Sequence, residues 1–453
     1  MTDTATLVAW DRQHLWHPFT QMADWMRDEP LVVSAAEGCT LIGSDGRRYL
    51  DGVSSLWCNV HGHAHPRIDA AVRDQLGKVA HSTMLGLSHR PAIELAQRLV
   101  ELTPPGLTRV FYSDSGSTAT EIALKMAFQY WRQRGGQHAR RTSFISLRNA
   151  YHGDTLGAVS VGGIGLFHSA YSPLLFETHH VEPGDAEQLE CVLDFRSEEI
   201  AAVIVEPLVQ GAAGIHVQPR GYLRRVRELC DRHDVFLICD EVATGFGRTG
   251  TMFACEQERV APDFLCLGKG LTGGYLPLAA TLATERVYEG FLGAAEDGRT
   301  FFHGHTFTGS PLACAAALAS LDAFESESTL LRLQPKIRLL GELLEEVGEM
   351  PEVAEVRGRG FMVGIDLGDH HRSLRLGHQV VLEARRRGAI VRPLGDVIVL
   401  MPPLSISKAD LRRLVEIVSE SIRAAFAGAY GEATAIDPLS EPETEELPIP
   451  QAA

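Results

Sequence analysis

Residues 235–241 read Val-Phe-Leu-Ile-Cys-Asp-Glu, and residues 264–269 read Phe-Leu-Cys-Leu-Gly-Lys. Each stretch is a short apolar run that ends in charged residues. Uninterrupted apolar runs of this length are typical of strands that are covered on both faces. Because open α/β sheets bind ligands beyond the carboxyl ends of their strands, Asp240 and Lys269 become candidate functional residues.

The same pattern extends on both sides of these runs. Further expected elements are strands at 109–112, 143–147 and 201–206 and helices at 121–130 and 221–233. Strands and helices in alternation predict an α/β fold, with a mostly parallel sheet covered by helices on both faces. We expect this large domain to span residues 71–325.

The last part of the chain has a different pattern. Expected elements are strands at 361–367, 389–391 and 397–401, a helix at 377–387, and a final helix with one apolar face made by Leu411, Leu414, Val415, Val418, Ile422 and Phe426. A turn at 394–396 would join the last two strands, and Ser407 with Asp410 is a start signal for the final helix. This predicts a smaller α+β domain at 326–430, which residues 1–70 could join.

Composition narrows the function classes. The chain has 453 residues and a formal net charge of -16, which argues against a nucleic-acid surface. No apolar stretch reaches the roughly 18 to 20 residues of a membrane span, and the N-terminus does not resemble a signal peptide. The eight cysteines contain no C-x-x-C pair, so we expect reduced thiols in the cytoplasm. Residues 431–453, with six acids and four prolines, are expected to form a disordered tail.

The turn at residues 113–118, Ser-Asp-Ser-Gly-Ser-Thr, follows an expected strand and opens a helix. Free backbone N–H groups and the positive end of a helix attract anions, so Ser115, Gly116 and Ser117 are candidate phosphate ligands. An ordinary serine-rich helix cap explains the segment equally well. The G-x-S-x-G spacing of a nucleophile elbow is absent.

The charged residues after the strands also have several interpretations. Adjacent acids such as Asp240 and Glu241 could bind a metal ion or cap a helix. A lysine at the end of an apolar strand must reach solvent, pair with an acid or be used covalently, because an unpaired buried cation is costly. A P-loop around Lys269 is excluded, since Asp263 stands at its first glycine and Leu271 replaces the required Ser or Thr.

Pyridoxal phosphate (PLP) accounts for these features together. It needs a lysine for covalent attachment, an acid beside its pyridine nitrogen, a cup for its phosphate and an aromatic side chain against its ring. Lys269, Asp240 and the 113–118 turn supply the first three. Tyr151, in the segment Tyr-His-Gly-Asp after another expected strand, can supply the fourth, although a core tyrosine is the ordinary alternative. Asp240 would keep the nitrogen protonated, because a nearby negative charge favours the cationic form.

With these residues in place, the chain resembles the class III aminotransferases of fold type I over nearly its whole length, the acidic tail excepted. Residues 240–250, Asp-Glu-Val-Ala-Thr-Gly-Phe-Gly-Arg-Thr-Gly, with Lys269 downstream, match that class specifically. The resemblance implies a PLP-dependent transaminase that forms a homodimer with its active sites at the interface. It also implies that Lys269, Asp240 and Tyr151 are catalytic and that Glu206 lies beside the cofactor.

In such a dimer, the loop Gly304-His305-Thr306 is expected to reach the cofactor phosphate of the other subunit. Its histidines, and those at positions 61, 63 and 65, could instead suggest a metal site. No cysteine or acid completes a ligand set at a suitable spacing, so we expect turn and packing roles and no metal.

Within class III, the resemblance is strongest to the diaminononanoate synthases of biotin biosynthesis. The matching segments are residues 15–20, 151–155, 206–211, 392–395 and 401–403. The resemblance implies 8-amino-7-oxononanoate as acceptor, 7,8-diaminononanoate as product and ping-pong kinetics. Arg392 could bind the acceptor's carboxylate through two parallel hydrogen bonds, although a surface arginine before a proline is the ordinary alternative.

The amino donor stays open between S-adenosylmethionine and lysine. The commoner, adenosylmethionine-using pattern has a tyrosine at the position of Phe19 and a second tryptophan at the position of Leu56. Their absence removes a hydrogen-bond donor and a stacking surface, and a lysine-using branch has a pocket more like this one. The expected substrate-binding residues are Phe19, Leu56, Trp57, Tyr151, Lys269, Gly304 and Arg392.

Two rival functions are consistent with parts of the sequence. A class III transaminase acting on ω-amino acids or diamines with pyruvate would share the cofactor residues and differ only in the substrate pocket. A PLP-free binding scaffold would not need Lys269, Asp240 and the phosphate turn together.

Overall fold

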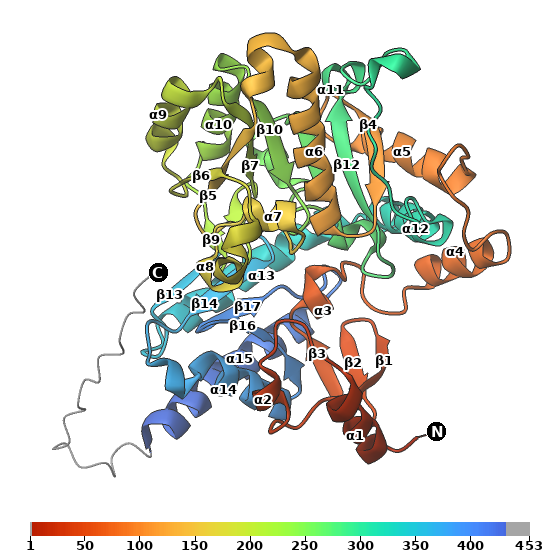
Figure 1. The fold of residues 1–453 in the computed structure, drawn as a ribbon. Coiled ribbons are helices and arrows are strands. Elements are labelled where there is room, and N and C mark those ends of the chain that lie inside the picture. Colours follow the sequence, from red (N-terminus) through yellow and green to blue (C-terminus); the bar gives the residue numbers. More distant parts are fainter. Residues whose placement is uncertain (1, 432–453) are drawn as a thin grey trace.

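The computed structural model describes residues 2–431 of the chain. Its centre is a seven-stranded sheet that carries helices on both faces (Figure 1). All the strands run parallel except β12, which is antiparallel to both of its neighbours. Across the sheet, the order is β4 (Leu107–Ser113), β12 (Ala279–Thr284), β11 (Phe264–Leu267), β10 (Phe236–Asp240), β7 (Ile200–Val205), β5 (Ser143–Leu147) and β6 (Thr178–Val181).

The central strands β7, β10 and β11 are buried on both faces, as their apolar sequences predict. In β10, Phe236 and Ile238 join the apolar cluster that includes α6, whereas Leu237 and Cys239 join the cluster that includes α10. The helices of this region are α4 (Pro66–Leu76), α5 (Arg90–Leu102), α6 (Gly116–Arg134), α7 (Leu156–Ser160), α8 (Gly165–His168), α9 (Ala186–Arg196), α10 (Tyr222–Arg232), α11 (Glu285–Glu289) and α12 (Pro311–Ser326). A short hairpin, β8 (Val209–Gln210) with β9 (His216–Val217), lies beside them.

The two ends of the chain meet below the large sheet (Figure 1). The N-terminal strand β3 (Arg48–Asp51) pairs in parallel with β15 (Ala389–Ile390), in a sheet completed by β1 (Val33–Glu37) and β2 (Thr40–Gly43). A second sheet holds β13 (Glu355–Arg359), β14 (Met362–Asp366), β17 (Val397–Leu400) and β16 (Arg392–Leu394). The accompanying helices are α1 (Thr4–His14), α2 (Met22–Trp25), α3 (Ser54–Trp57), α13 (Thr329–Gly348), α14 (Leu376–Arg386) and α15 (Lys408–Gly431).

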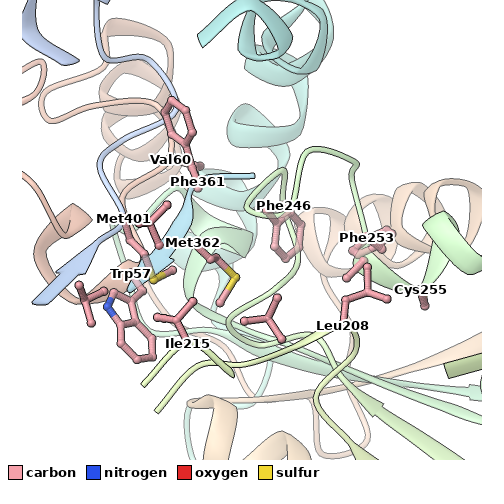
Figure 2. Close-up of a cluster of buried hydrophobic side chains, with 14 of the residues drawn as sticks. Trp57, Val60, Leu208, Ile215, Phe246, Phe253, Cys255, Phe361, Met362 and Met401 are labelled. Carbon is pink, nitrogen blue, oxygen red and sulfur yellow. The ribbon is translucent and has the colours of Figure 1, made fainter. Parts of the chain in front are cut away.

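One apolar cluster connects the chain ends to the large sheet. Trp57 and Val60 from the N-terminal part pack with Phe246 from the large sheet region and with Met362 and Met401 from the C-terminal part (Figure 2). On the strength of this packing and the β3–β15 pairing, we propose the expected division into 71–325 and a small domain built from 1–70 and 326–430. The predicted tail at 431–453 lies, beyond its first residue, outside the described residues.

Several expected elements have the bounds that the sequence predicts. The strands at 143–147 and 264–267 match β5 and β11 residue for residue. The final helix begins after Ser407, whose hydroxyl accepts the backbone N–H of Asp410 at 3.0 Å. None of the described helices combines the length and apolar character needed to cross a membrane.

The predicted pairing of 389–391 with 397–401 across the turn at 394–396 is wrong. β15 leaves that hairpin and pairs with β3, and β16, which contains Arg392, pairs with β17 instead. Apolar content alone could not show which of these runs forms the hairpin. Hydrogen bonds across the turn at Gly395, where φ is +61°, place β16 beside β17.

The aromatic packing on the α6 face generates a stability prediction. Phe236 is fully buried, with ring centroids 4.9 Å from Tyr130, 5.0 Å from Trp131 and 5.6 Å from Phe264. Phe236→Ala should lower the free energy of unfolding by about 3–5 kcal/mol, seen as a lower urea midpoint. Phe195→Ala, at a side chain that is 84% exposed, is the control and should change it by less than about 0.5 kcal/mol. Equal effects of the two changes would contradict this packing.

Candidate active site

The proposed phosphate turn is a well-formed helix start. Ser115 caps α6, with its hydroxyl accepting the N–H of Thr118 at 3.3 Å, and the Thr118 hydroxyl accepts the N–H of Ser115 at 3.0 Å. The first N–H groups of a helix have no acceptor within the helix, which leaves those of Gly116 and Ser117 to point outward. The Ser117 hydroxyl accepts the N–H of Asp154 at 3.1 Å, which attaches the turn to the loop that carries Tyr151.

Two glycines let the surrounding loops approach this turn. A Cβ on Gly116 would lie 2.5 Å from a methyl group of Val242, in the loop after β10. Gly153 has a φ of +120°, and a Cβ there would lie 2.1 Å from the hydroxyl oxygen of Ser117. The loops after β4, β5 and β10 therefore meet in one place, at the carboxyl edge of the sheet.

Asp240 ends β10 and is 4% exposed. One carboxylate oxygen lies 2.8 Å from Nδ1 of His152, whose side chain is fully buried, and the other accepts the N–H of Val242 at 3.0 Å. His152 thus fixes the direction of the Asp240 carboxylate. The sequence contains His152 in a noted segment, but nothing in its spacing signals a contact with a residue 88 positions away.

The neighbouring acid, Glu241, points elsewhere. Its carboxylate accepts the hydroxyl of Thr244 at 2.6 Å and the backbone N–H groups of Ala254 and Cys255 at 3.0 and 2.8 Å. Burial raises the pKa of this carboxyl. Glu241 therefore braces the loop 244–255, a role that differs from the two suggested by the sequence. Within residues 2–431, no group of three His, Cys, Asp or Glu side chains is arranged to hold a metal ion.

Lys269 follows β11 and faces a cavity, which we call the inner cavity or the Lys269 cavity. Burial lowers the pKa of its amine, opposed by the negative charges of Asp240 and Glu206. Its Nζ lies 4.8 Å from the ring centroid of Trp57. The cavity is lined by Trp57, Gly116, Ser117, Tyr151, His152, Gly153, Glu206, Ala212, Asp240, Val242, Ala243 and Lys269. The structure therefore brings together all the predicted cofactor residues except Ser115, which caps the adjoining helix, and the loop 304–306.

Glu206 and Tyr151 form another wall of this cavity. The Glu206 carboxylate accepts the backbone N–H groups of Tyr151 at 3.1 Å and Gly211 at 2.8 Å, and burial raises its pKa to about 7. The Tyr151 hydroxyl donates to Asp154 at 2.7 Å, and burial raises the pKa of that phenol.

A second, outer cavity adjoins Tyr151 and contains Arg392. Phe19 lies there, 5.5 Å from the ring of Phe167 and 6.5 Å from that of Tyr151. The guanidinium carbon of Arg392 is 6.0 Å from the Phe19 ring, and burial lowers the pKa of this arginine. The cavity is lined by Phe19, Asn149, Ile164, Leu166, Phe167, Ala212, Ala213, Gly214, Arg392, Pro393, Leu394 and Gly395.

Two substrate-pocket details go beyond the sequence prediction. Phe167 is a pocket residue that sequence reasoning missed, because α8 is a single turn without periodicity. Leu56 lines neither cavity; its side chain is 49% exposed beside the buried Trp57.

The loop 304–306 does not reach the Lys269 cavity of its own chain. Gly304 and His305 line a separate hollow with Met84 and Tyr112. His305 is held in place by its Nδ1, 3.2 Å from the Asp114 carboxylate, and by a contact of its Nε2 with His303 at 3.2 Å.

The other noted histidines have packing partners. His61 lies 3.0 Å from the Ser320 hydroxyl, His63 2.9 Å from Asp51, and His65 2.8 Å from Glu327. Burial lowers the pKa of His61 to about 4, which keeps it neutral.

Residues 21–422 match the family model described as aminotransferase class-III. The chain belongs to the class-III aminotransferases. A relative from Nitratidesulfovibrio vulgaris, named adenosylmethionine-8-amino-7-oxononanoate aminotransferase, is 58% identical over 443 residues, covering 92% of this chain and 82% of the relative.

Solved structures agree with this assignment. The crystal structure of adenosylmethionine-8-amino-7-oxononanoate aminotransferase from Methanocaldococcus jannaschii superposes with a TM-score of 0.91 at 45% identity, covering 93% of this chain and 99% of that one. A PLP-bound amine transaminase from an uncultivated Pseudomonas species gives 0.83 at 38% identity, covering 92% and 99%. The predictions of fold type I, of an aminotransferase and of PLP as cofactor are confirmed.

The residues of the inner cavity fit PLP. The helix start with outward N–H groups suits a phosphate, the loop contacts leave no room for a Cβ at Gly116 or Gly153, and the Asp240 carboxylate is fixed by His152. A lysine amine with a lowered pKa faces the same space. These groups come from four different loops, and each suits one part of the cofactor.

The close approach at Gly153 predicts a loss of cofactor affinity on substitution. In Gly153→Ala, the new Cβ would displace Ser117 and the helix start, so the Kd for PLP should rise by about tenfold or more. Titration of apo-protein with PLP, followed by absorbance, measures this. Gly341→Ala, at a helix position with nothing within 4 Å, is the control and should leave the Kd unchanged. Unaltered affinity in Gly153→Ala would contradict the geometry.

The lowered pKa of Lys269 predicts a pH dependence. Burial favours the neutral amine, which is the nucleophile, at a lower pH than for an exposed lysine. The rate constant for covalent attachment of PLP to the apo-enzyme should therefore rise with pH and reach its plateau earlier than the same reaction of N-acetyl-lysine amide. Stopped-flow absorbance compares the two reactions, and a plateau at the same or a higher pH would count against the assignment.

Proposed function

We propose that this chain transfers an amino group to 8-amino-7-oxononanoate and forms 7,8-diaminononanoate, as in biotin biosynthesis. The names of relatives at 58% and 45% identity support this acceptor. The observation that carries it is Arg392: it lines the outer cavity next to Tyr151, and no carboxylate of residues 2–431 forms an ion pair with it. A partly desolvated guanidinium without an acid partner suits a substrate carboxylate.

The proposed cofactor site uses the inner cavity. Lys269 would attach the cofactor, Asp240 would hold its pyridine nitrogen protonated, and Tyr151 would pack against its ring. Glu206 would contact the cofactor, and Ser115, Gly116 and Ser117 would bind its phosphate. We propose a cytoplasmic homodimer in which Gly304, His305 and Thr306 complete the site of the other subunit, which accords with their distance from the Lys269 cavity of their own chain.

PLP, when bound, accepts electrons from the substrate carbon that loses its proton. The chain's own groups move that proton. The Lys269 amine, when not bonded to the cofactor, would act as the general base, and burial, which lowers its pKa, favours the neutral form that can accept a proton. Asp240 would maintain positive charge at the ring nitrogen, and Trp57, which is 6% exposed, would keep water from the amine. Donor and acceptor use the same cavity in turn, which gives ping-pong kinetics.

The donor is S-adenosylmethionine or lysine. The relatives' names favour adenosylmethionine. Phe19, which lines the outer cavity, offers no hydroxyl to a nucleoside, and this favours a smaller donor. Phe167, 5.5 Å from Phe19, adds an aromatic surface that partly offsets this loss.

A second candidate is an amine or ω-amino acid transaminase that uses pyruvate. The observation in its favour is the 38% identity to the PLP-bound amine transaminase over 92% of this chain. This candidate would share the Lys269 cavity and would not need Arg392 for a long acceptor.

The deciding experiment offers 8-amino-7-oxononanoate with each donor separately and measures the diamine product. Arg392→Met should raise the KM for this acceptor by about 10- to 100-fold, since hydrogen bonds to a charged group contribute about 1.5–3 kcal/mol. Arg140→Met is the control, because it removes the same charge from an exposed side chain. The KM of this variant for the acceptor should equal the wild-type value. No diamine with either donor, combined with rapid amination of pyruvate, would establish the second candidate instead.

A further inference from the structure

The segment that carries Trp57 has a backbone that non-glycine residues rarely adopt. We call residues 53–59 the tryptophan turn. Ser54, Ser55 and Trp57 have φ values of +50°, +61° and +64°, and Ser55 combines its φ with a ψ of -78°. This pair of angles is close to the rare, strained γ-turn with positive φ. Such conformations persist only where the surrounding contacts determine them, so the turn needs a specific restraint.

The buried carboxylate of Asp51 supplies that restraint. Asp51 is 1% exposed, and one of its oxygens accepts the N–H groups of Val53 at 3.3 Å and Ser55 at 2.8 Å. The other oxygen accepts the hydroxyl of Ser55 at 3.1 Å. One carboxylate thus holds Ser55, the most strained residue of the turn, by both its backbone and its side chain.

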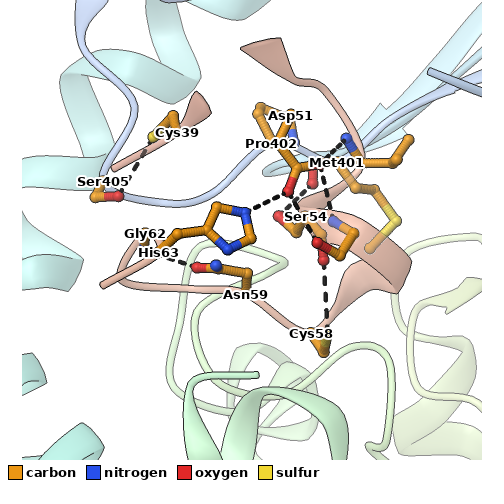
Figure 3. A network of polar contacts seen from close by, with 12 residues as sticks. Cys39, Asp51, Ser54, Cys58, Asn59, Gly62, His63, Met401, Pro402 and Ser405 are labelled. Carbon is orange, nitrogen blue, oxygen red and sulfur yellow. Dashed lines mark hydrogen bonds and ion pairs between the residues drawn. The ribbon is translucent and has the colours of Figure 1, made fainter. Parts of the chain in front are cut away.

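His63 fixes this carboxylate from the other side. Its Nε2 lies 2.9 Å from the same Asp51 oxygen that binds the Ser55 hydroxyl. The backbone of His63 exchanges two hydrogen bonds with Gly38, at 2.6 and 3.0 Å, which anchors it to the β1–β2 hairpin. The turn has a second anchor, because the Ser54 hydroxyl donates to the carbonyl of Met401 at 2.7 Å (Figure 3).

The far end of the turn lies in the active site. The centroid of the Trp57 ring is 4.8 Å from the Nζ of Lys269. A Cβ on Gly211 would lie 3.2 Å from the nearest atom of the same ring. The indole is therefore confined between the lysine and the loop held by Glu206. A small shift of the turn would move the ring relative to both.

We propose that Asp51 and His63 are positioning residues that set substrate affinity by holding the tryptophan turn, and with it Trp57, in place. Neither residue lines the inner or the outer cavity. The proposal rests on the assignment of the Lys269 cavity as the place where substrate binds. It does not depend on which acceptor or donor occupies that cavity.

The test compares Asp51→Ala, which removes every acceptor, with Asp51→Asn, whose amide oxygen can still accept the two backbone N–H groups. Asp51→Ala should raise KM by about tenfold or more, while kcat falls less than about threefold. The KM of Asp51→Asn should stay within about threefold of the wild-type value. His65→Gln is the matched control: it breaks a similar pair, to Glu327, on the same segment and should leave KM unchanged. KM is measured for each amine that the wild type accepts, so an error in the proposed acceptor would not affect the result.

A double-mutant cycle separates positioning from general stability. In a Trp57→Ala background, adding Asp51→Ala should change KM by less than about twofold, because the ring through which Asp51 acts is gone. Hydrogen exchange of apo-protein should be faster in residues 52–60 for Asp51→Ala and unchanged for His65→Gln. If Asp51→Ala fails to fold, Ser55→Ala and His63→Ala replace it in the same double-mutant cycle. These variants remove the contacts of the Asp51 oxygen that binds the Ser55 hydroxyl and His63. Additive KM effects, or normal exchange in the turn, would overturn the proposal.

Discussion

The amine of Lys269 is the constraint around which the candidate active site is arranged. It stands at the end of a fully apolar strand, and its pKa is lowered by burial although Asp240 and Glu206 lie nearby. No carboxylate of residues 2–431 forms an ion pair with it, and Trp57 covers it instead. Both acids are occupied elsewhere: Asp240 by His152, and Glu206 by two backbone N–H groups. The amine is thereby kept reactive and directed into the cavity.

The proposed substrate side of the site depends on the two chain ends meeting. Phe19 and Trp57 come from the N-terminal part and Arg392 from the C-terminal part. The guanidinium of Arg248, 1% exposed, connects both ends to the large sheet: it donates to the carbonyl of Pro402 at 2.7 Å and to that of Asn59 at 2.9 Å. A buried cation that satisfies carbonyls from two distant segments fixes their relative position.

The sequence predicted best what depends on local pattern. The strands at 143–147 and 264–267 are short, mostly apolar runs, and their bounds agree with the structure. The antiparallel strand β12 was not predicted, because Ala-Ala-Thr-Leu-Ala-Thr lacks the bulky β-branched residues that mark a strand. The hairpin at 392–400 was misplaced because β15 is defined by its pairing with β3, more than 300 residues away in the chain.

The same limit applies to the candidate site. The proximity of Lys269, Asp240 and the 113–118 turn could be predicted because each follows a strand, and strand ends gather at one edge of a parallel sheet. His152, Phe167 and Asp51 could not, because their roles are contacts with residues distant in sequence. The resemblance to class III supplied Arg392, which local pattern alone would have left on the surface.

The most direct test of the central claim is the site of cofactor attachment. Reduction of the holoenzyme with borohydride, followed by proteolysis and mass spectrometry, identifies the lysine that carries the pyridoxyl group. The account predicts that group on Lys269 alone, with loss of the visible absorbance of the cofactor and of all transaminase activity. A pyridoxyl group on any other lysine, or full activity after reduction, would contradict it.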